Sequence, residues 1–547
     1  MHNKTKTKAI ALAATATMIY NPASAQFDDD DVIRLNGSQP IITRSMFPSN
    51  RRSDGDNING PSLIRVPNFI SRGNRVNRDA NYYLYFGHHG GEYIRMAWAE
   101  NVTGPYRLYD AGASVGDRGV LDDNRNRIDL DNGVGIQDNH ISSPDVHVET
   151  SPNRIVMYFH AGGYRFEGRN INSQRSFVNT SSRGAEFRRR DTEPVVLGDS
   201  YFKVFEDNNT LYAMDNRGIP RRARSFNNPW RPTNGYYNGN SLASLWEQNN
   251  NDFYQDAIRD ERNQGRSQRR LRHTGVRTAG REAQIFFSER GDNHEHIRVS
   301  RINLNVNSWN NWNPTYPGNE LLRPVSGWEG GQFNRRNSEA GAAPENVSQL
   351  RDPDVFEDSD GSLYLLYSGR GEDAIGIAAL RNNRQTIRTA GATHDAVVRG
   401  GSQSGSNFRN NDLAIQNGSG TSDRRSFLRF NTPNSPRTIR AAVLRLYAEN
   451  SGGGRIDIHG INSGVNFNEA NITRNNDPGQ GSRLARVDMG PGSQWYEFDV
   501  TAHVENARRN NRNVGFVVRG GTSGSQIRFT SSEGPSNRRP QLKFMFR

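Results

Sequence analysis

The sequence predicts an all-β protein in two parts, a β-propeller followed by a β-sandwich. The 547 residues exceed what one hydrophobic core normally organises, so at least two domains are expected. Only 33% of the residues are hydrophobic and 54 are glycine, which favours short strands joined by many turns over a helical or membrane bundle. Aromatic strand cores recur over the first 380 residues, whereas the strands of the last part show no repeat.

A repeated strand pattern predicts the propeller over residues 26–385. The repeated cores begin at Tyr82, Arg154, Thr210, Gln284 and Ser362, so their starts are 72, 56, 74 and 78 residues apart. Several cores are preceded by another strand, such as PDVHVE at 144–149, and several are followed by a third. Units of three or four strands at this spacing are typical of propeller blades, and five such repeats are legible.

The C-terminal part is predicted to be a separate domain. Residues 386–410 are rich in Gly, Ser and Asn and are expected to form a linker. Residues 411–547 contain short strands such as SFLRF, AAVLRLYAE and VGFVVRG, which favour a β-sandwich. The segment FTSSEGPSNRRPQLKFMF, together with FLRFNTP and AVLRLYAE, resembles the carbohydrate-binding sandwiches of secreted polysaccharide-degrading enzymes. That resemblance implies that this domain binds carbohydrate.

The first 25 residues have the order of a secretory signal peptide. Lysines at 4, 6 and 8 precede an apolar run from Ala9 to Tyr20, and Ala23-Ser24-Ala25 follows. We therefore expect cleavage after Ala25 and a secreted protein without a membrane span, because the apolar run is too short to cross a bilayer. The chain has no cysteine, which excludes disulfides and thiolate metal sites.

The charge predicts an anionic partner. The formal net charge is +12, and only five of the 70 cationic residues are lysine. Arginine binds carboxylate, sulfate or phosphate oxygens two at a time. Because a secreted protein rarely meets nucleic acid, an acidic polysaccharide is the favoured partner, although a genomic bias explains the bulk of the arginines equally well. We expect a monomer without an organic cofactor.

Histidines gather at the ends of the predicted inner strands. His88 and His89 end the first aromatic strand, His140 and His147 flank the SSPD turn, and His160 ends the second aromatic strand. Strand ends present side chains at the central face of a propeller, where they could line one pocket. A structural hydrogen-bonding role explains His88, His89 and His147 as well.

Ordered segments across the predicted propeller resemble secreted lyases that cut ulvan, a sulfated rhamnose-uronate polysaccharide. They are YYLYFGHHGGEYIRMAWAENVTGPYRLYD, DNHISSPDVHVE, IVMYFHAGG, LGDSYFKVFEDNNTLYAMDNRG and RHTGVRTAGREAQIFFSERGDNHEHIRVS, within about residues 60–380. The resemblance implies seven blades and a site formed by His140, His160, Tyr201 and Arg217. It also implies a bound metal ion, calcium or zinc, for which His273 is a candidate ligand.

The chemistry of such a lyase suits these residue types. β-Elimination removes the weakly acidic C5 proton of a uronate, and a bidentate grip by Arg217 would neutralise the developing charge. Tyr201 would act as base or donate a proton to the departing oxygen, and a nearby guanidinium would favour its ionised form. His140 would be its partner in proton transfer. His160, with His88 and His89, would position the substrate, and the products would carry unsaturated uronate ends.

Two other functions stay open from the sequence. A propeller glycoside hydrolase could use Asp145 and Asp354, which occupy equivalent places in SSPDV and RDPDV, as its acid and base. A repeated aspartate that caps a turn would show the same equivalence. A non-catalytic polysaccharide-binding protein is the third reading, because propellers host many functions.

Overall fold

The computed structural model describes residues 27–546 except 92, 110–118, 123–139, 163, 167–168, 172–173, 188–196, 224–236, 239–240, 243–245, 250–269, 383–384, 410–411, 463–464 and 521–525. The predicted signal peptide, residues 1–25, lies outside the described residues. Among the described residues, no helix has the length and apolar character needed to span a membrane.

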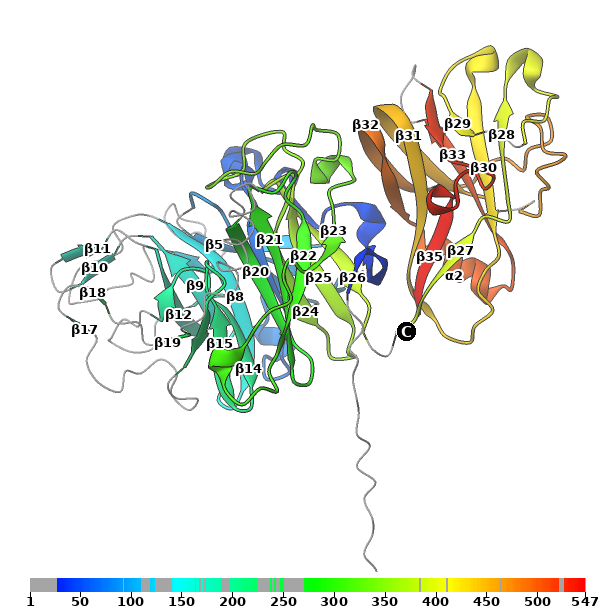
Figure 1. Cartoon of the computed structure of the whole chain (residues 1–547). Helices are drawn as coiled ribbons and strands as arrows, with labels where there is room; N and C mark the ends of the chain where they lie inside the picture. Colours follow the sequence, from blue (N-terminus) through cyan, green and yellow to red (C-terminus); the bar gives the residue numbers. More distant parts are fainter. Residues whose placement is uncertain are drawn as a thin grey trace, which may run out of the picture.

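Five antiparallel sheets of four or five strands form the propeller (Figure 1). The first blade is β3 (Asn59–Arg65), β4 (Tyr82–Gly87), β5 (Tyr93–Ala99) and β6 (Arg107–Tyr109), with β7 (Leu121–Asp122) added to β5. The second is β8 (Ile141–Thr150), β9 (Asn153–Ala161), β12 (Arg175–Ser181) and β13 (Gly198–Asp199). The third is β14 (Lys203–Asp207), β15 (Thr210–Met214), β16 (Pro220–Arg222) and β19 (Glu247–Gln248).

The last two blades complete the ring. The fourth is β20 (Arg270–Thr278), β21 (Glu282–Arg290), β22 (Ile297–Asn303) and β23 (Asn319–Leu322). The fifth is β24 (Leu350–Glu357), β25 (Leu363–Gly369) and β26 (Ala374–Leu380), joined by β1 (Val32–Arg34) and β2 (Ile42–Thr43). Two small hairpins, β10 (Tyr164–Phe166) with β11 (Arg169–Ile171) and β17 (Tyr237–Asn238) with β18 (Ser241–Leu242), extend from the second and third blades.

The number of blades is therefore five, as the legible repeats predicted. The five aromatic cores found in the sequence correspond to β4, β9, β15, β21 and β25, the second strand of each blade. The seven blades implied by the resemblance are wrong for this structure. β1 pairs with β26, so Val32 lies opposite Leu380, and the N-terminal strand closes the ring by completing the last blade.

The C-terminal part is one nine-stranded sheet that curls around a large apolar core, and a smaller apolar cluster lies beside it. Its strands are β27 (Ile387–Gly391), β28 (His394–Arg399), β29 (Leu413–Ile415), β30 (Arg424–Phe430), β31 (Ile439–Gly460), β32 (Arg483–Asp499), β33 (Val514–Gly520), β34 (Ile527–Phe529) and β35 (Gln541–Phe546). The helix α2 (Thr501–Arg509) follows β32. The predicted all-β class is confirmed. We call this part, residues 386–546, the module.

The expected linker at 386–410 is wrong. β27 pairs with β35 and β28 pairs with β30, so both strands of this segment belong to the sheet of the module. The strands were missed because the segment is rich in glycine and serine, and because IRTAG and HDAVVR are short and carry few large apolar residues. The module therefore begins about 25 residues before the predicted boundary at 411.

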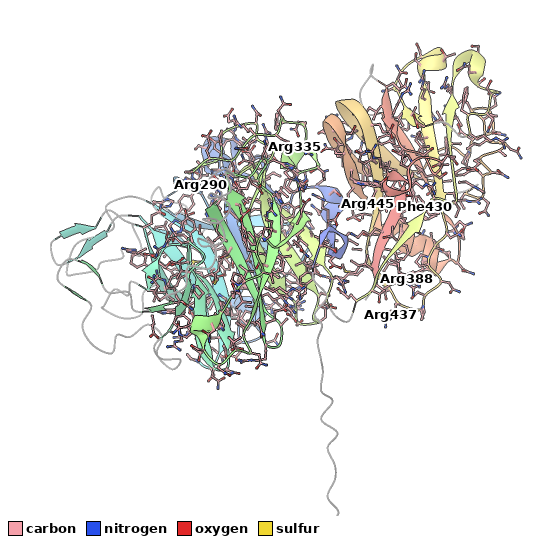
Figure 2. The ribbon with its side chains drawn as sticks, in the orientation of Figure 1. Arg290, Arg335, Arg388, Phe430, Arg437 and Arg445 are labelled. Atoms are coloured by element: carbon pink, nitrogen blue, oxygen red, sulfur yellow. The ribbon has the colours of Figure 1, made fainter. Side chains whose placement is uncertain are left out.

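The module packs against the fifth blade and β1. Arg34 of β1 is buried, and it binds Glu329 of the propeller at 2.8 Å and Glu497 of β32 at 2.9 Å. The Nζ of Lys543 donates to the carbonyl of Asp29 at 2.8 Å. Figure 2 shows Arg445 on the side of the module that faces the propeller, where its Nε lies 3.1 Å from Glu497. Buried charge pairs across this contact fix the two parts relative to each other.

Candidate functional site

The site is built where four of the five inner strands change register. β3, β8, β20 and β24 each contain a register shift at the same place, between Asn59 and Ser62, Ser142 and Asp145, Leu271 and Thr274, and Arg351 and Asp354. In three of these strands a proline follows the shifted residue, and proline has no N–H to donate to the ladder. β-Bulges of this kind aim side chains and are common next to active sites.

The shifted residues converge on the propeller axis. Gly60, Ser143 and Asp352 adopt positive φ angles of 56°, 51° and 49°, and Tyr201, immediately before β14, has φ 65°. A bulky residue in the left-handed region costs about 1–3 kcal/mol and is retained where it serves a function. One pocket at the axis is lined by Gly60, Ser143, Tyr201, Lys203, His273, Thr274, Asp352 and Pro353.

Tyr201 lies between two imidazoles. Its ring centroid is 4.1 Å from that of His160, at the end of β9, and 4.6 Å from that of His273 in β20, each at an interplanar angle of 35°. The three rings come from three successive blades, so the packing of the propeller holds the phenol in one place. The structure thus brings together the predicted Tyr201 and His160.

His140 joins this stack through His160. The Nε2 atoms of the two histidines lie 2.9 Å apart, within hydrogen-bond distance. His160 is fully buried, and burial together with the charges of His140 and His273 lowers its pKa well below the usual range. A neutral His160 can share one proton with His140, so the two residues act as a unit in proton transfer.

Burial raises the pKa of Tyr201 to about 12, with Glu372 adding to the rise and Arg272 opposing it. The guanidinium of Arg272 does lower the pKa of Tyr201 and so favours the ionised phenol, as predicted, but burial outweighs it and the net shift is upward. At neutral pH Tyr201 carries its proton. This state suits a group that donates a proton to a departing oxygen.

Arg217 lies close in the fold to the segment that precedes Tyr201 and is held by a carboxylate. It is in the turn between β15 and β16, and the backbone N of Asn216 donates to the carbonyl of Ser200 at 2.9 Å. The guanidinium of Arg217 pairs with Asp199, and 44% of its side chain is exposed. Arg217 is thus next to the chain that carries Tyr201, with exposed nitrogens that a ligand can reach.

His88 and His89 lie at the edge of the site near Glu372 of the fifth blade. The Nδ1 of His89 is 3.6 Å from Glu372, and Asn57 donates to the same carboxylate. Burial alone would raise the pKa of Glu372, but hydrogen bonding from His89 and the charge of Arg351 hold it well below the usual range. Burial and Arg95 lower the pKa of His88 to about 4. His89 and His140 have ring centroids 6.3 Å apart, so His89 borders the histidine pair.

His273 does not complete a metal site among the described residues. Its Nδ1 contacts Asp352. Two donors fall short of the four ligands of zinc and of the larger oxygen shell of calcium. Over the described ranges, three potential ligand side chains with atoms within 4.8 Å of one another occur as Asp395, Glu469 and Glu533 in the module, a group without His273. His273 serves here as the stacking partner of Tyr201.

Asp145 and Asp354 lie deeper along the axis and share one ammonium. The Nζ of Lys203 is 3.5 Å from Asp145 and 3.3 Å from Asp354, and the Nε2 of His147 is 2.8 Å from Asp145. Burial would raise the pKa of Asp145, but His147 and Lys203 lower it, whereas burial prevails at Asp354 and raises its pKa. Both aspartates line a pocket of about 400 Å³ at the other end of the inner strands.

The sequence interpretation missed two acidic residues of the site, Asp352 and Glu372. Asp352 precedes Pro353 as Ser143 precedes Pro144, so the repeated X-Pro step would have placed it at the axis. The sequence contains no comparable signal for Glu372, which follows the Gly369–Gly371 turn.

Comparisons with known proteins give a family match for the module and a relative for a larger part of the chain. Residues 386–545 match the model of carbohydrate-binding module family 96. "Uncharacterized protein R118" of Acanthamoeba polyphaga mimivirus is 27% identical over 377 residues, covering 66% of this chain and 94% of that protein. The module thus has the sequence of a carbohydrate-binding family.

Two solved structures show only a weak likeness. An exo-β-1,3-galactanase from Phanerochaete chrysosporium with galactose is 9% identical over 89% of this chain and 95% of its own, with a TM-score of 0.39. A thermostable family-43 glycoside hydrolase is 13% identical over 59% of this chain and 88% of its own, with a TM-score of 0.35. At these values neither structure bears on how this chain works.

Proposed function

We propose that the protein is a secreted polysaccharide lyase that cleaves ulvan by β-elimination at a uronate. The observation that carries the proposal is the stack of His160, Tyr201 and His273 at the axis, with His140 bonded to His160. A protonated phenol held beside neutral imidazoles provides a proton donor and a proton acceptor in one place. The family match of the module supports a polysaccharide substrate.

In the proposed reaction, the histidine pair of His140 and His160 takes the C5 proton of the uronate. The electrons of the C5–H bond form the C4=C5 double bond, the bond between C4 and the glycosidic oxygen breaks, and Tyr201 donates its proton to that oxygen. Arg217 neutralises the charge that develops on the carboxylate, and its pairing with Asp199 keeps the guanidinium near this position. His88 and His89 border the substrate. No water is consumed.

The hydrolase alternative is favoured by one specific observation. Asp145 and Asp354 share Lys203, line one pocket and have pKa values displaced in opposite directions, as an acid and a base require. In this mechanism Asp354 would be the proton donor and Asp145 the nucleophile or base. One observation weakens the hydrolase alternative. Both carboxylates are bound to the same buried cation, and ion pairs that only stabilise a turn explain this arrangement equally well.

Incubation with ulvan tests the two mechanisms. A lyase releases 4,5-unsaturated uronate ends that absorb ultraviolet light, whereas a hydrolase releases reducing ends without that absorbance. Tyr201→Phe should abolish the absorbance, and Asp145→Asn, if it folds, should retain activity. Inactive but folded Asp145→Asn and Asp354→Asn, with an active Tyr201→Phe, would establish the hydrolase. Binding without either product would leave the non-catalytic binding protein.

A further inference from the structure

Three arginines gather at one edge of the module. Arg399 ends β28 and Arg424 begins β30, and the two residues lie directly opposite each other in the antiparallel register. Arg528 lies in β34, and its charge and that of Arg399 both act on Arg424. We call these three residues the arginine edge. Like charges placed opposite each other on a sheet are destabilising, so this arrangement has a cost.

Few anionic groups of the protein offset this charge. In the described part of the chain, the carboxylate paired with the arginine edge is Asp412, 3.9 Å from Arg528, and this pair is largely exposed. Asp423, the neighbour of Arg424, instead pairs with Arg425 at 3.5 Å and Arg474 at 3.6 Å. Burial, followed by the charges of Arg399 and Arg528, lowers the pKa of Arg424. The electrostatic environment is thus net positive.

Three other arginines of the module are matched with acids at close range. Arg486 lies 2.6 Å from Asp457, Arg455 lies 2.8 Å from Asp488, and Arg508 lies 2.7 Å from Glu505. The arginine edge differs from these three pairs. An uncompensated group of guanidinium groups on a carbohydrate-binding fold fits an anionic ligand.

Neutral side chains hold two of the guanidinium groups in place. Arg399 donates to Gln403 at 3.3 Å and lies 4.2 Å from the ring centroid of Phe408, a cation–π contact that fixes its plane. Arg424 donates to Gln526. Because each guanidinium has five N–H donors, these amide contacts leave donors for a ligand.

We propose that Arg399, Arg424 and Arg528 form a subsite that binds the sulfate or carboxylate groups of an acidic polysaccharide. This deepens the proposed function, on which it rests, because it assigns the recognition of the anionic groups to the module. The subsite would hold the polymer by paired N–H···O bonds and by charge. The propeller, packed against the module, would act on the same chain.

The test is calorimetric titration of ulvan into the full-length protein in the Tyr201→Phe background, so that binding is measured with little cleavage. The double substitution Arg399→Gln with Arg424→Gln should raise Kd about tenfold or more, as the loss of two charge-assisted contacts predicts. The control is Arg388→Gln with Arg437→Gln, which removes the same charge from two exposed arginines. Figure 2 shows both at the end of the module away from β29. The control should change Kd by less than about twofold.

Desulfated ulvan and carboxyl-reduced ulvan identify the group that is bound. With each polymer, the Kd of the double variant is compared with the Kd of the parent. If the two Kd values become equal with one polymer, the subsite binds the group that this polymer lacks. A difference that survives with ulvan that is both desulfated and carboxyl-reduced would overturn the proposal, as would equal weakening in the control. Single-stranded DNA that binds as tightly as ulvan would also overturn it. Arg528→Gln, at an exposed site, repeats the test if the double variant loses its thermal transition, and an unchanged Kd there would contradict the subsite.

These outcomes are separate from the fate of the enzymatic proposal. Ultraviolet-absorbing ends or reducing ends released by the Tyr201→Phe protein during titration would contradict the role of Tyr201 and leave the binding result intact. Conversely, if the protein is a lyase and the double substitution leaves the Kd for ulvan unchanged, the proposed mechanism stands and the arginine subsite is contradicted.

Discussion

The phenol ring of Tyr201 lies 4.1 Å, centroid to centroid, from the imidazole ring of His160. The two residues belong to neighbouring blades, and the left-handed backbone of Tyr201, with φ 65°, directs its side chain onto the histidine. Because His160 is also bonded to His140, a proton on the phenol lies next to an acceptor on the imidazoles.

Tyr201→Phe removes the donor oxygen and keeps the ring that packs between His160 and His273. We expect kcat on ulvan to fall by about 10²-fold to 10⁴-fold, the usual contribution of a positioned acid or base. The melting temperature should stay close to that of the parent. Tyr212→Phe, which removes a phenol oxygen from the same blade, is the control and should retain activity. A fully active Tyr201→Phe would remove this residue from the mechanism.

Arg217→Lys keeps the positive charge and loses the planar fork. An ammonium cannot reproduce a bidentate grip on a carboxylate, so kcat/KM should fall by about 10²-fold or more. The fall should lie mainly in kcat, since the charge that Arg217 neutralises develops in the transition state. Arg222→Lys, which changes an exposed pair with Glu247 in the same blade, is the matched control. Equal losses in both variants would show that Arg217 has no specific role.

The fold could be predicted where strands repeat along the sequence. It could not be predicted where the two strands of a pair are distant in sequence. Aromatic cores such as Tyr82–Phe86 gave the blades because each second strand is buried on both faces. The closing strand β1 has only three residues, and its partner strand lies about 350 residues later in the sequence, so no local pattern predicts it. β27 and β28 were missed because their stability comes from pairing with β35 and β30, and their own residues have few apolar side chains.

The site was predictable in part for a related reason. His140, His160 and Tyr201 came from a resemblance in motif spacing, and the structure brings them together. Glu372 approaches the site through the closure of the ring between the last blade and the first, and Asp352 through its contact with His273 of the fourth blade, so both relationships depend on how the blades are arranged. The pKa of Tyr201 could not be predicted, because it is set by burial at the axis.

Glu505 gives the stability of the module a pH dependence. Hydrogen bonding from Arg508 lowers the pKa of this carboxyl from 4.5 to about 2. Because the folded pKa is the lower one, the stabilisation is complete above pH 4.5 and is lost as the pH falls through about 2. The free energy of unfolding, measured with denaturant, should therefore become more similar for the parent and Glu505→Gln as the pH falls below 4.5. The control Glu339→Gln, at an exposed site, should have the same free energy of unfolding as the parent at each pH. A constant difference at all pH values would contradict the assignment.

Arg34→Met tests the contact between propeller and module. Without its guanidinium, Glu329 and Glu497 remain buried beside each other, and the free energy of unfolding should fall by about 3–5 kcal/mol. The parent should unfold in one calorimetric transition because this contact couples the two parts. Arg455→Met removes an exposed pair with Asp488 and should cost less than about 1 kcal/mol. Two independent transitions in the parent, unaffected by Arg34→Met, would show that the parts are not coupled.

The central claim is that the propeller breaks the glycosidic bond without water, and digestion of ulvan in isotopically labelled water tests it most directly. Mass spectrometry of the products should show an unsaturated uronate at the new non-reducing end, a mass lower by one water than that of the hydrolysed fragment, and no isotope incorporated by cleavage. Brief digestion with a hydrolase of known action, under the same conditions, corrects for exchange at reducing ends. Products that carry one labelled oxygen for each bond broken and lack the unsaturated end would contradict the lyase and assign cleavage to a hydrolytic mechanism.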